Sequence, residues 1–421
     1  MLRGGALFYA LALAVVLAFM SGGLLLAAHL ERLQLARDRS SDAVIANANS
    51  GLQLLLGKQQ LVAYDTPAEL DLFGQRHDSV SLTLRRWGLF DVLLSRAHNR
   101  KLEHRIAALA GAASLPNDNT ALRMADLERP LGVCGKTILR GDCYLPTGGI
   151  RHTYVEGQNF TGERDVYGSI KTAPRMLPEP DKALLRRLDS LLAGKFAATD
   201  SLIALPDAAE VDSLANSFFN APAVARYNNA IVLRNQTLCG NICIYSSRSI
   251  RVEASANLQD VLLIAPYIEL ADKVEGRFQA LARDSLRTGK EVKLNYPSVL
   301  GIVTSKQSPP QTWLQTGEKC SIDGLLFGMQ TVPDFTRTLL LSTGEETKVR
   351  GRIWCNELVD LRGTVYGDVS CKLFRLQTRS AVYENQLLNA EIDRSKRPGY
   401  FVLPALHSTE TEEKRIARWL Y

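Results

Sequence analysis

The sequence predicts an α+β protein with a β-helix. We expect an N-terminal transmembrane or spine helix, a small β-meander head, and a C-terminal right-handed β-helix-like solenoid. Three observations lead to this class. The stretch Ala6–Leu30 contains no Asp, Glu, Lys or Arg, apolar and polar residues alternate between about 78 and 110, and apolar positions recur every 18 residues from Ile250. Alternation is typical of half-buried strands, and a repeat of this length indicates stacked coils sharing one core.

Residues 1–30 are expected to hold a short basic leader and a transmembrane helix. Twenty-five helical residues rise about 37 Å, enough to cross a hydrocarbon core. A cleaved signal peptide is the alternative, because Arg3 precedes the apolar run. The run is longer than the usual signal core, and the sequence after it offers no clean small-x-small cleavage site. We therefore prefer a retained anchor.

Three residues interrupt the apolar run, namely Ser21, Gly22 and Gly23. Small residues allow membrane helices to approach closely, so they are candidate helix-packing positions. A tolerated kink in a plain anchor explains them equally well. The flanking charges do not fix the orientation: a simple count of Arg32, Arg37 and Arg39 would retain the large domain in the cytoplasm, but long domains are translocated regardless of such charges.

Residues 31–60 continue the helical pattern. Apolar positions fall at three- and four-residue steps, and no proline occurs before Pro67. The anchor is therefore expected to run into an amphipathic spine of about 50 residues in all, a length that follows from this periodicity.

Residues 61–175 are expected to form a β-rich head. The segments 79–87 and 90–97 read as strands joined by a tight turn at Trp87-Gly88, and 101–110 reads as a third strand or a short helix. The segment 132–143 reads as a hairpin whose base a Cys134–Cys143 bridge would close. Residues 176–228 are a linker with short helices, one of them at Pro180–Gly194.

Residues 229–395 are expected to form the β-helix-like domain, with a polar insertion near 305–318. Ile250, Ile268 and Leu286 would stack on successive coils. Glycines such as Gly324 and Gly351 would take tight corners. Cys355 and Cys371 lie one coil apart. Residues 396–421 read as an amphipathic tail that caps an open solenoid end or lies on a partner.

Cysteine usage suggests an oxidising compartment. Among the seven cysteines, two pairs are close in sequence, Cys134 with Cys143 and Cys239 with Cys243, and are candidate disulfides. The odd count leaves at least one thiol free or paired between chains. The net charge of +6 is small for 421 residues and no basic run occurs, so nucleic-acid binding is not expected.

Catalytic motifs are missing from the sequence. The six histidines are dispersed, and no zinc-site spacing, P-loop or nucleophile elbow occurs. We expect no enzyme activity, no metal and no cofactor. Acidic residues of the predicted coils would line a groove in a polysaccharide-cleaving β-helix, but the outward positions of any solenoid carry such residues; these are Asp260, Glu269, Asp272, Glu275 and Asp284.

The first 60 residues resemble the N-terminal helix of type IV pilin-like proteins, most of all minor pilins and the minor pseudopilins of type II secretion. The matching features are a short basic leader ending in Gly4-Gly5, the apolar run, and the Ala-, Arg- and Asn-rich continuation. The resemblance implies that the leader is removed after Gly4 or Gly5 and that the helices pack into a filament core. The family's glutamate at the fifth position after cleavage is replaced by Tyr9 or Ala10, which implies an accessory or tip role.

The C-terminal half resembles bactofilin-like polymer-forming β-helices, most clearly at LRGTVYGDV (361–369). Together the resemblances imply a non-enzymatic, single-pass protein of the bacterial inner membrane with a periplasmic body. It would serve as an accessory or tip subunit of a type IV pilus- or type II secretion-like filament, with the membrane and other pilin-like or envelope subunits as partners. The alternatives are a membrane-tethered scaffold that self-associates through its β-helix, and an envelope polysaccharide-binding or polysaccharide-cleaving β-helix.

Overall fold

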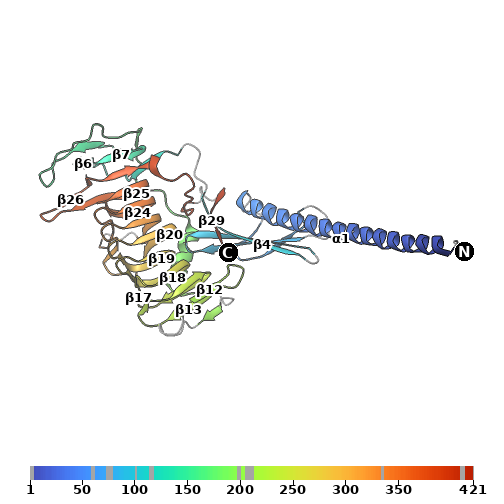
Figure 1. The fold of residues 1–421 in the computed structure, drawn as a ribbon. Helices are drawn as coiled ribbons and strands as arrows, with labels where there is room; N and C mark the ends of the chain where they lie inside the picture. Colours follow the sequence, from blue (N-terminus) through green and yellow to red (C-terminus); the bar gives the residue numbers. More distant parts are fainter. Residues whose placement is uncertain are drawn as a thin grey trace.

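The computed structural model shows an α+β protein arranged in three layers: a long helix, an antiparallel sheet and a large β-rich body (Figure 1). The helix projects from the body, and the antiparallel sheet lies between them. The structure describes residues 4–57, 62–72, 79–99, 102–112, 118–196, 201–203, 213–332, 336–407 and 413–420.

The N-terminal helix α1 is a single 54-residue element, Gly4–Gly57, which confirms the continuous helix expected from the apolar run and its continuation. Residues 5–39 are exposed, whereas Val44, Ala48, Leu52 and Leu55 are buried. These four follow the three- and four-residue steps that place side chains on one helix face. That face packs on the antiparallel sheet.

The antiparallel head sheet has five strands in the order β1-β2-β3-β4-β29. The three predicted strands are confirmed, and the third segment is a strand instead of a helix. One face of the sheet meets α1 and the other meets the body, so β3 and β4 contain runs of consecutive buried residues. The strands are β1 (Ala68–Leu70), β2 (Ser79–Trp87), β3 (Phe90–His98), β4 (Glu103–Ala112) and β29 (Lys414–Leu420).

Strand β29 corrects the expected role of the C-terminal segment. Residues 414–420 do not cap an end of the body; they pair antiparallel with β4 of the same chain. A sheet edge such as β4 offers unpaired backbone groups, and β29 supplies their partners while burying Leu420 against the body. The head therefore combines segments from both ends of the described chain.

The body consists of one large, mainly parallel sheet that closes on itself and a separate, small parallel sheet of three strands. Its strands stack in layers, and each long strand pairs with the layer before and the layer after it. The first strands are β5 (Thr120–Met124), β6 (Leu131–Cys134), β7 (Ile138–Arg140), β8 (Asp142–Leu145), β9 (Ile150–His152), β10 (Ile170–Thr172), β11 (Ser201–Ile203), β12 (Ser213–Asn216), β13 (Ala223–Tyr227), β14 (Ile231–Leu233), β15 (Thr237–Gly240), β16 (Ile242–Ser246) and β17 (Ser249–Val252).

The later strands of the body are longer. They are β18 (Asn257–Leu270), β19 (Glu275–Thr288), β20 (Lys293–Thr304), β21 (Gln311–Gln315), β22 (Ser321–Gln330), β23 (Thr338–Ser342), β24 (Lys348–Asp360), β25 (Thr364–Gln377), β26 (Val382–Glu384), β27 (Gln386–Leu388) and β28 (Glu391–Asp393), followed by the 3-10 helix η2 (Arg394–Lys396).

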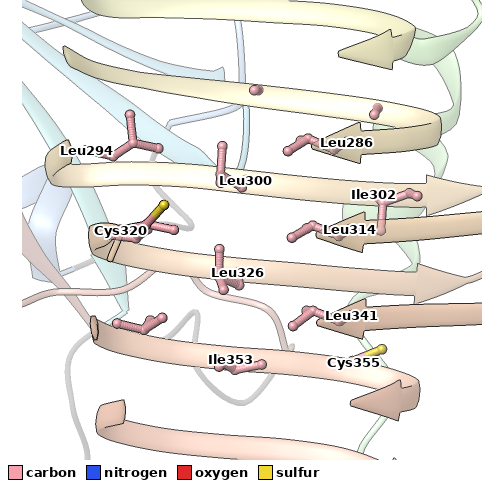
Figure 2. Packing of buried hydrophobic residues seen from close by; sticks show 14 of the residues in the cluster. Leu286, Leu294, Leu300, Ile302, Leu314, Cys320, Leu326, Leu341, Ile353 and Cys355 are labelled. Carbon is pink, nitrogen blue, oxygen red and sulfur yellow. The ribbon is translucent and has the colours of Figure 1, made fainter. Parts of the chain in front are cut away.

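Buried side chains in the body line up in columns, one residue per layer (Figure 2). Ile250 pairs with Ile268, and Ile268 with Leu286, as the sequence repeat predicts. The column continues to Leu314 and Leu341. One layer cannot bury its inward residues alone, so stacking creates the continuous core. Cys355 and Cys371 are likewise register partners on β24 and β25.

A column of glycines marks one line of the body. Gly324, Gly351 and Gly367 pair in register and have φ values of +146°, +138° and +156°. A Cβ on Gly351 would lie 1.9 Å from the carbonyl oxygen of Gly324. These glycines therefore sit inside strands that approach each other closely, where the sequence had suggested corners.

Two expectations for the body are corrected by the pairings. Residues 131–145 form three short strands and no hairpin: β6 and β7 pair parallel with the distant strands β27 and β28, and β8 pairs parallel with the preceding β5. Strand β5 also pairs with β25. This part of the expected head therefore belongs to the body. The expected polar insertion contains β21, whose Leu314 is fully buried.

The helix α2 (Lys182–Leu192) confirms the helix expected at 180–194. The Asp181 side chain caps it by accepting from the Ala183 N–H. Its Leu184 and Leu188 pack with Leu262 and Leu281 on the outer face of the body. The head sheet covers the same face through Trp87 and other apolar residues, so the head and body share one core.

Candidate assembly surface

The exposed N-terminal half of α1 is the most prominent apolar surface that the structure describes. Side chains such as Leu7, Phe8 and Phe19 expose 77%, 69% and 78% of their area. Apolar side chains point to every side of this segment, which is the pattern of a helix surrounded by lipid or by other apolar helices. By length and composition, α1 can cross a membrane.

The predicted helix-packing residues lie within this exposed segment. A Cβ on Gly22 or on Gly23 would meet nothing within 4 Å. The hydroxyl of Ser21 donates to the Ala18 carbonyl at 3.0 Å, so its hydrogen-bonding group is satisfied within the helix. The three residues therefore make this turn of the helix thinner, and the Ser21 hydroxyl adds no unsatisfied polar group there. The predicted processing residues Gly4 and Gly5 are the first two residues of α1.

The C-terminal half of α1 is fixed to the head sheet. The Ser95 hydroxyl donates to the Ala48 carbonyl at 2.7 Å in a buried contact. A Cβ on Gly51 would lie 2.7 Å from side-chain atoms of Val80, Leu82 and Ser95, so the helix backbone lies directly on the sheet. This contact fixes the direction in which the exposed half leaves the head.

The head is in turn fixed to the body by buried polar contacts. The Trp87 indole N–H donates to the Asp260 carbonyl at 3.2 Å. Gln279 of β19 hydrogen-bonds the β2–β3 turn. From α2, the Arg187 guanidinium donates to the Arg86 carbonyl, and burial lowers the pKa of Arg187 to about 10. Helix, head and body therefore form one continuous packed unit.

The cysteines are all free thiols in the structure, so neither of the two candidate disulfides is formed in it. Cys134 packs with Val155 and Leu376, whereas Cys143 belongs to the main core of the body. Cys243 faces the junction with the head, and Cys239 is half-buried. Burial raises the pKa of Cys143 to about 12.

The acidic residues considered for a catalytic groove are mostly engaged in ion pairs. Asp260 pairs with Arg277 at 2.9 Å, Glu269 with Arg251 at 3.0 Å, and Glu275 with Lys293 at 2.6 Å. Asp284 pairs with Arg283 at 2.8 Å, and Asp272 accepts from the Lys290 N–H at 2.7 Å. Among the described residues, no group of three His, Cys, Asp or Glu is placed to hold a metal ion.

The residues that join the layers are not marked by any sequence motif. Gln279, Arg187 and the strand β29 act through partners more than 90 positions away, and no local pattern distinguishes them.

Comparison with known proteins adds little. No family model matches the chain, and no curated protein matches it. Among solved structures, the chain is similar to the competence-associated pilin ComZ from Thermus thermophilus, with a TM-score of 0.24 and 11% identity over 90% of this chain and 96% of that chain. A TM-score this low supports no conclusion about function.

Proposed function

We propose that this protein is a non-enzymatic, membrane-anchored accessory or tip subunit of a type IV pilus- or type II secretion-like filament. The observation that carries the proposal is the division of α1 into two halves. One half is apolar on every side and exposed, and the other is packed on the head sheet. A helix that only anchored the chain would not need a rigid connection to its cargo.

The rigid connection supports assembly because the position of the helix then fixes the position of the head. Helices that pack side by side place their heads in a defined arrangement only if each helix and its head move as one unit. The buried contacts at Ala48 and Gly51 provide such a unit here. We place the bulk of the chain on the extracytoplasmic side of the bacterial inner membrane, in keeping with the pilin-like pattern of the first 60 residues.

We also infer that the body is a β-helix-like solenoid. Each inward residue pairs with its counterpart one coil later, in a single direction through the stack, as for Leu300, Leu326 and Ile353. In a solenoid each coil contacts only its neighbours. Such a stack would present an extended outer surface away from the membrane, which suits a subunit that displays a surface on a filament.

Membrane extraction and crosslinking test the proposal. The full chain, expressed in a Gram-negative bacterium with a type IV pilus or type II secretion system, should stay in the membrane after carbonate extraction. A photo-crosslinker at Leu13 or Val16 should capture the helices of other pilin-like subunits. Replacing Gly22 and Gly23 with leucine should weaken capture and leave membrane retention unchanged. Extraction by carbonate, or crosslinks to lipid alone, would overturn the proposal.

A further inference from the structure

The segment of α1 between the apolar span and the head carries charged side chains that form no ion pair with the rest of the described chain. We call residues 31–42 the stalk. The first polar contact between α1 and the head is at its end, where the Asn99 side chain donates to the Ser40 hydroxyl at 2.7 Å. Apart from Ser40 and Ser41, every stalk residue is exposed.

The stalk charges form two stripes. At 100° per residue, Glu31, Asp38 and Asp42 fall within about 40° of one another on the helix surface. We call them the acidic stripe. Arg32 and Arg39 fall within about 20° of each other and form the basic stripe, about 90° around the helix from the acidic one. Both stripes lie away from the face that carries Val44 and Ala48, which packs on the head.

Neither stripe is neutralised by the described part of the chain. None of the five side chains takes part in an ion pair or hydrogen bond with another described residue. Asp38 and Asp42 are four residues apart, so they stand one turn from each other and repel. The repulsion within a stripe of like charge destabilises the isolated helix. A stripe of opposite charge on a neighbouring helix would offset this repulsion.

The spacing of the two stripes matches. Glu31 and Asp38 are seven residues apart, as are Arg32 and Arg39. When two copies of α1 lie parallel with almost no axial offset, Glu31 and Asp38 of one copy face Arg32 and Arg39 of the other at the same time. A shift by seven residues, about 10.5 Å along the axis, still brings Asp38 next to a partner's Arg32 position.

We propose that the stalk is a self-association surface, in which the acidic stripe of one copy pairs with the basic stripe of the next. This inference rests on the proposed function and narrows it to an accessory subunit present in adjacent copies. The two stripes occupy different faces, so the contact is heterologous and leaves one free stripe of each kind on every pair. Such contacts add further copies instead of closing a dimer.

Charge exchange tests this proposal in membranes from cells that make the full chain. Leu35 lies between the stripes on the helix surface, so Leu35→Cys with a short bifunctional maleimide should yield a covalent dimer. In that background, Arg32→Glu with Arg39→Glu places acid against acid, and Glu31→Arg with Asp38→Arg places base against base. Each pair of changes should lower the dimer yield by about tenfold, a factor that corresponds to about 1.4 kcal/mol.

Combining all four exchanges should restore the yield, because the stripes are complementary again. Arg37→Glu is the matched control: Arg37 lies on the opposite side of the helix and its reversal should leave the yield unchanged. Failure of the fourfold variant to recover, or crosslinks from the Leu35→Cys variant to a different protein, would overturn self-association. Loss of the chain to carbonate extraction would instead overturn the proposed function, so the two failures are distinguishable.

Discussion

Gln279 of the body holds the turn at Gly88 of the head through both ends of its side-chain amide. Its Oε1 accepts from the Leu89 N–H at 2.8 Å, and its Nε2 donates to the Trp87 carbonyl at 2.9 Å. A Cβ on Gly88 would lie 2.1 Å from Oε1. Position 88 therefore requires glycine for two reasons: its left-handed φ of +59°, and the Gln279 amide, which occupies the space that a side chain would need.

Gln279→Leu is expected to loosen the junction between head and body. The change leaves a buried N–H and a buried carbonyl without partners, and each unsatisfied group costs about 1 to 3 kcal/mol. The free energy of unfolding, measured by urea denaturation of the full chain in detergent, should therefore fall by about 2 to 6 kcal/mol. Gln315→Leu, at an exposed position of β21, should change it by less than about 0.5 kcal/mol.

A double-mutant cycle separates the clash at Gly88 from its backbone conformation. Gly88→Ala should destabilise through both causes, whereas in a Gln279→Ala background only the strain of the positive φ remains. The combined loss should be smaller than the sum of the single losses. Strict additivity would show that the two residues do not interact.

Replacing a glycine of the column with alanine is expected to lower the stability more than the same change at a glycine with open space around it. Gly351→Ala places a Cβ 1.9 Å from the Gly324 carbonyl oxygen at a φ of +138°, so the neighbouring strands must separate. We expect a loss of more than about 3 kcal/mol, or failure to fold. Gly149→Ala is the control, because its φ of +67° is also positive but nothing lies within 4 Å of the new Cβ. It should cost about 1 kcal/mol, and equal losses at both sites would contradict the close approach.

Acid is expected to weaken the body through Asp142. Hydrogen bonds from Ser169 and Lys171 lower the pKa of Asp142 to about 2. Because the folded value lies below the ordinary value of 3.8, this contribution is complete above the ordinary value and is lost as the pH falls toward 2. In urea denaturation at several pH values, Asp142→Asn should flatten the loss of stability in that window. Lys171→Met should flatten this loss only in part. If the pH dependence of the free energy of unfolding is unchanged in both variants, Asp142 does not cause it.

Thiol reactivity should follow burial. Cys239 is half-buried, whereas the other six cysteines are buried, and burial raises the pKa of Cys355 to about 12. In the native protein at mildly alkaline pH, iodoacetamide should therefore modify Cys239 first and the remaining thiols only after unfolding. Peptide mapping by mass spectrometry measures the order.

The same mapping without reductant, on protein taken from cells, also tests the cysteine pairs proposed from the sequence. Thiols at Cys134 and Cys143 that become reactive on unfolding alone would agree with the structure. A bridge between these two residues would require the clusters that hold them apart to rearrange. Early modification of Cys355 in the native state would contradict the burial that separates the seven thiols into two classes.

Features that depend on local periodicity could be predicted from the order of the amino acids. The apolar and amphipathic patterns defined α1, the alternation defined β2 and β3, and the 18-residue recurrence of Ile250, Ile268 and Leu286 identified residues that pair in register. In each case the side chains on one surface recur at a regular spacing along the chain, so the spacing indicates which residues lie on that surface.

The pairing of segments that are not adjacent in the sequence becomes visible only in the folded chain. Residues 131–145 looked like a local hairpin, yet their strands pair with β5, β27 and β28, because added layers extend the core of the body. The pairing of β29 with β4 and the bonds of Gln279 likewise depend on partners supplied by remote segments. Partner choice is set by the free energy of the whole packed arrangement, which no local spacing encodes.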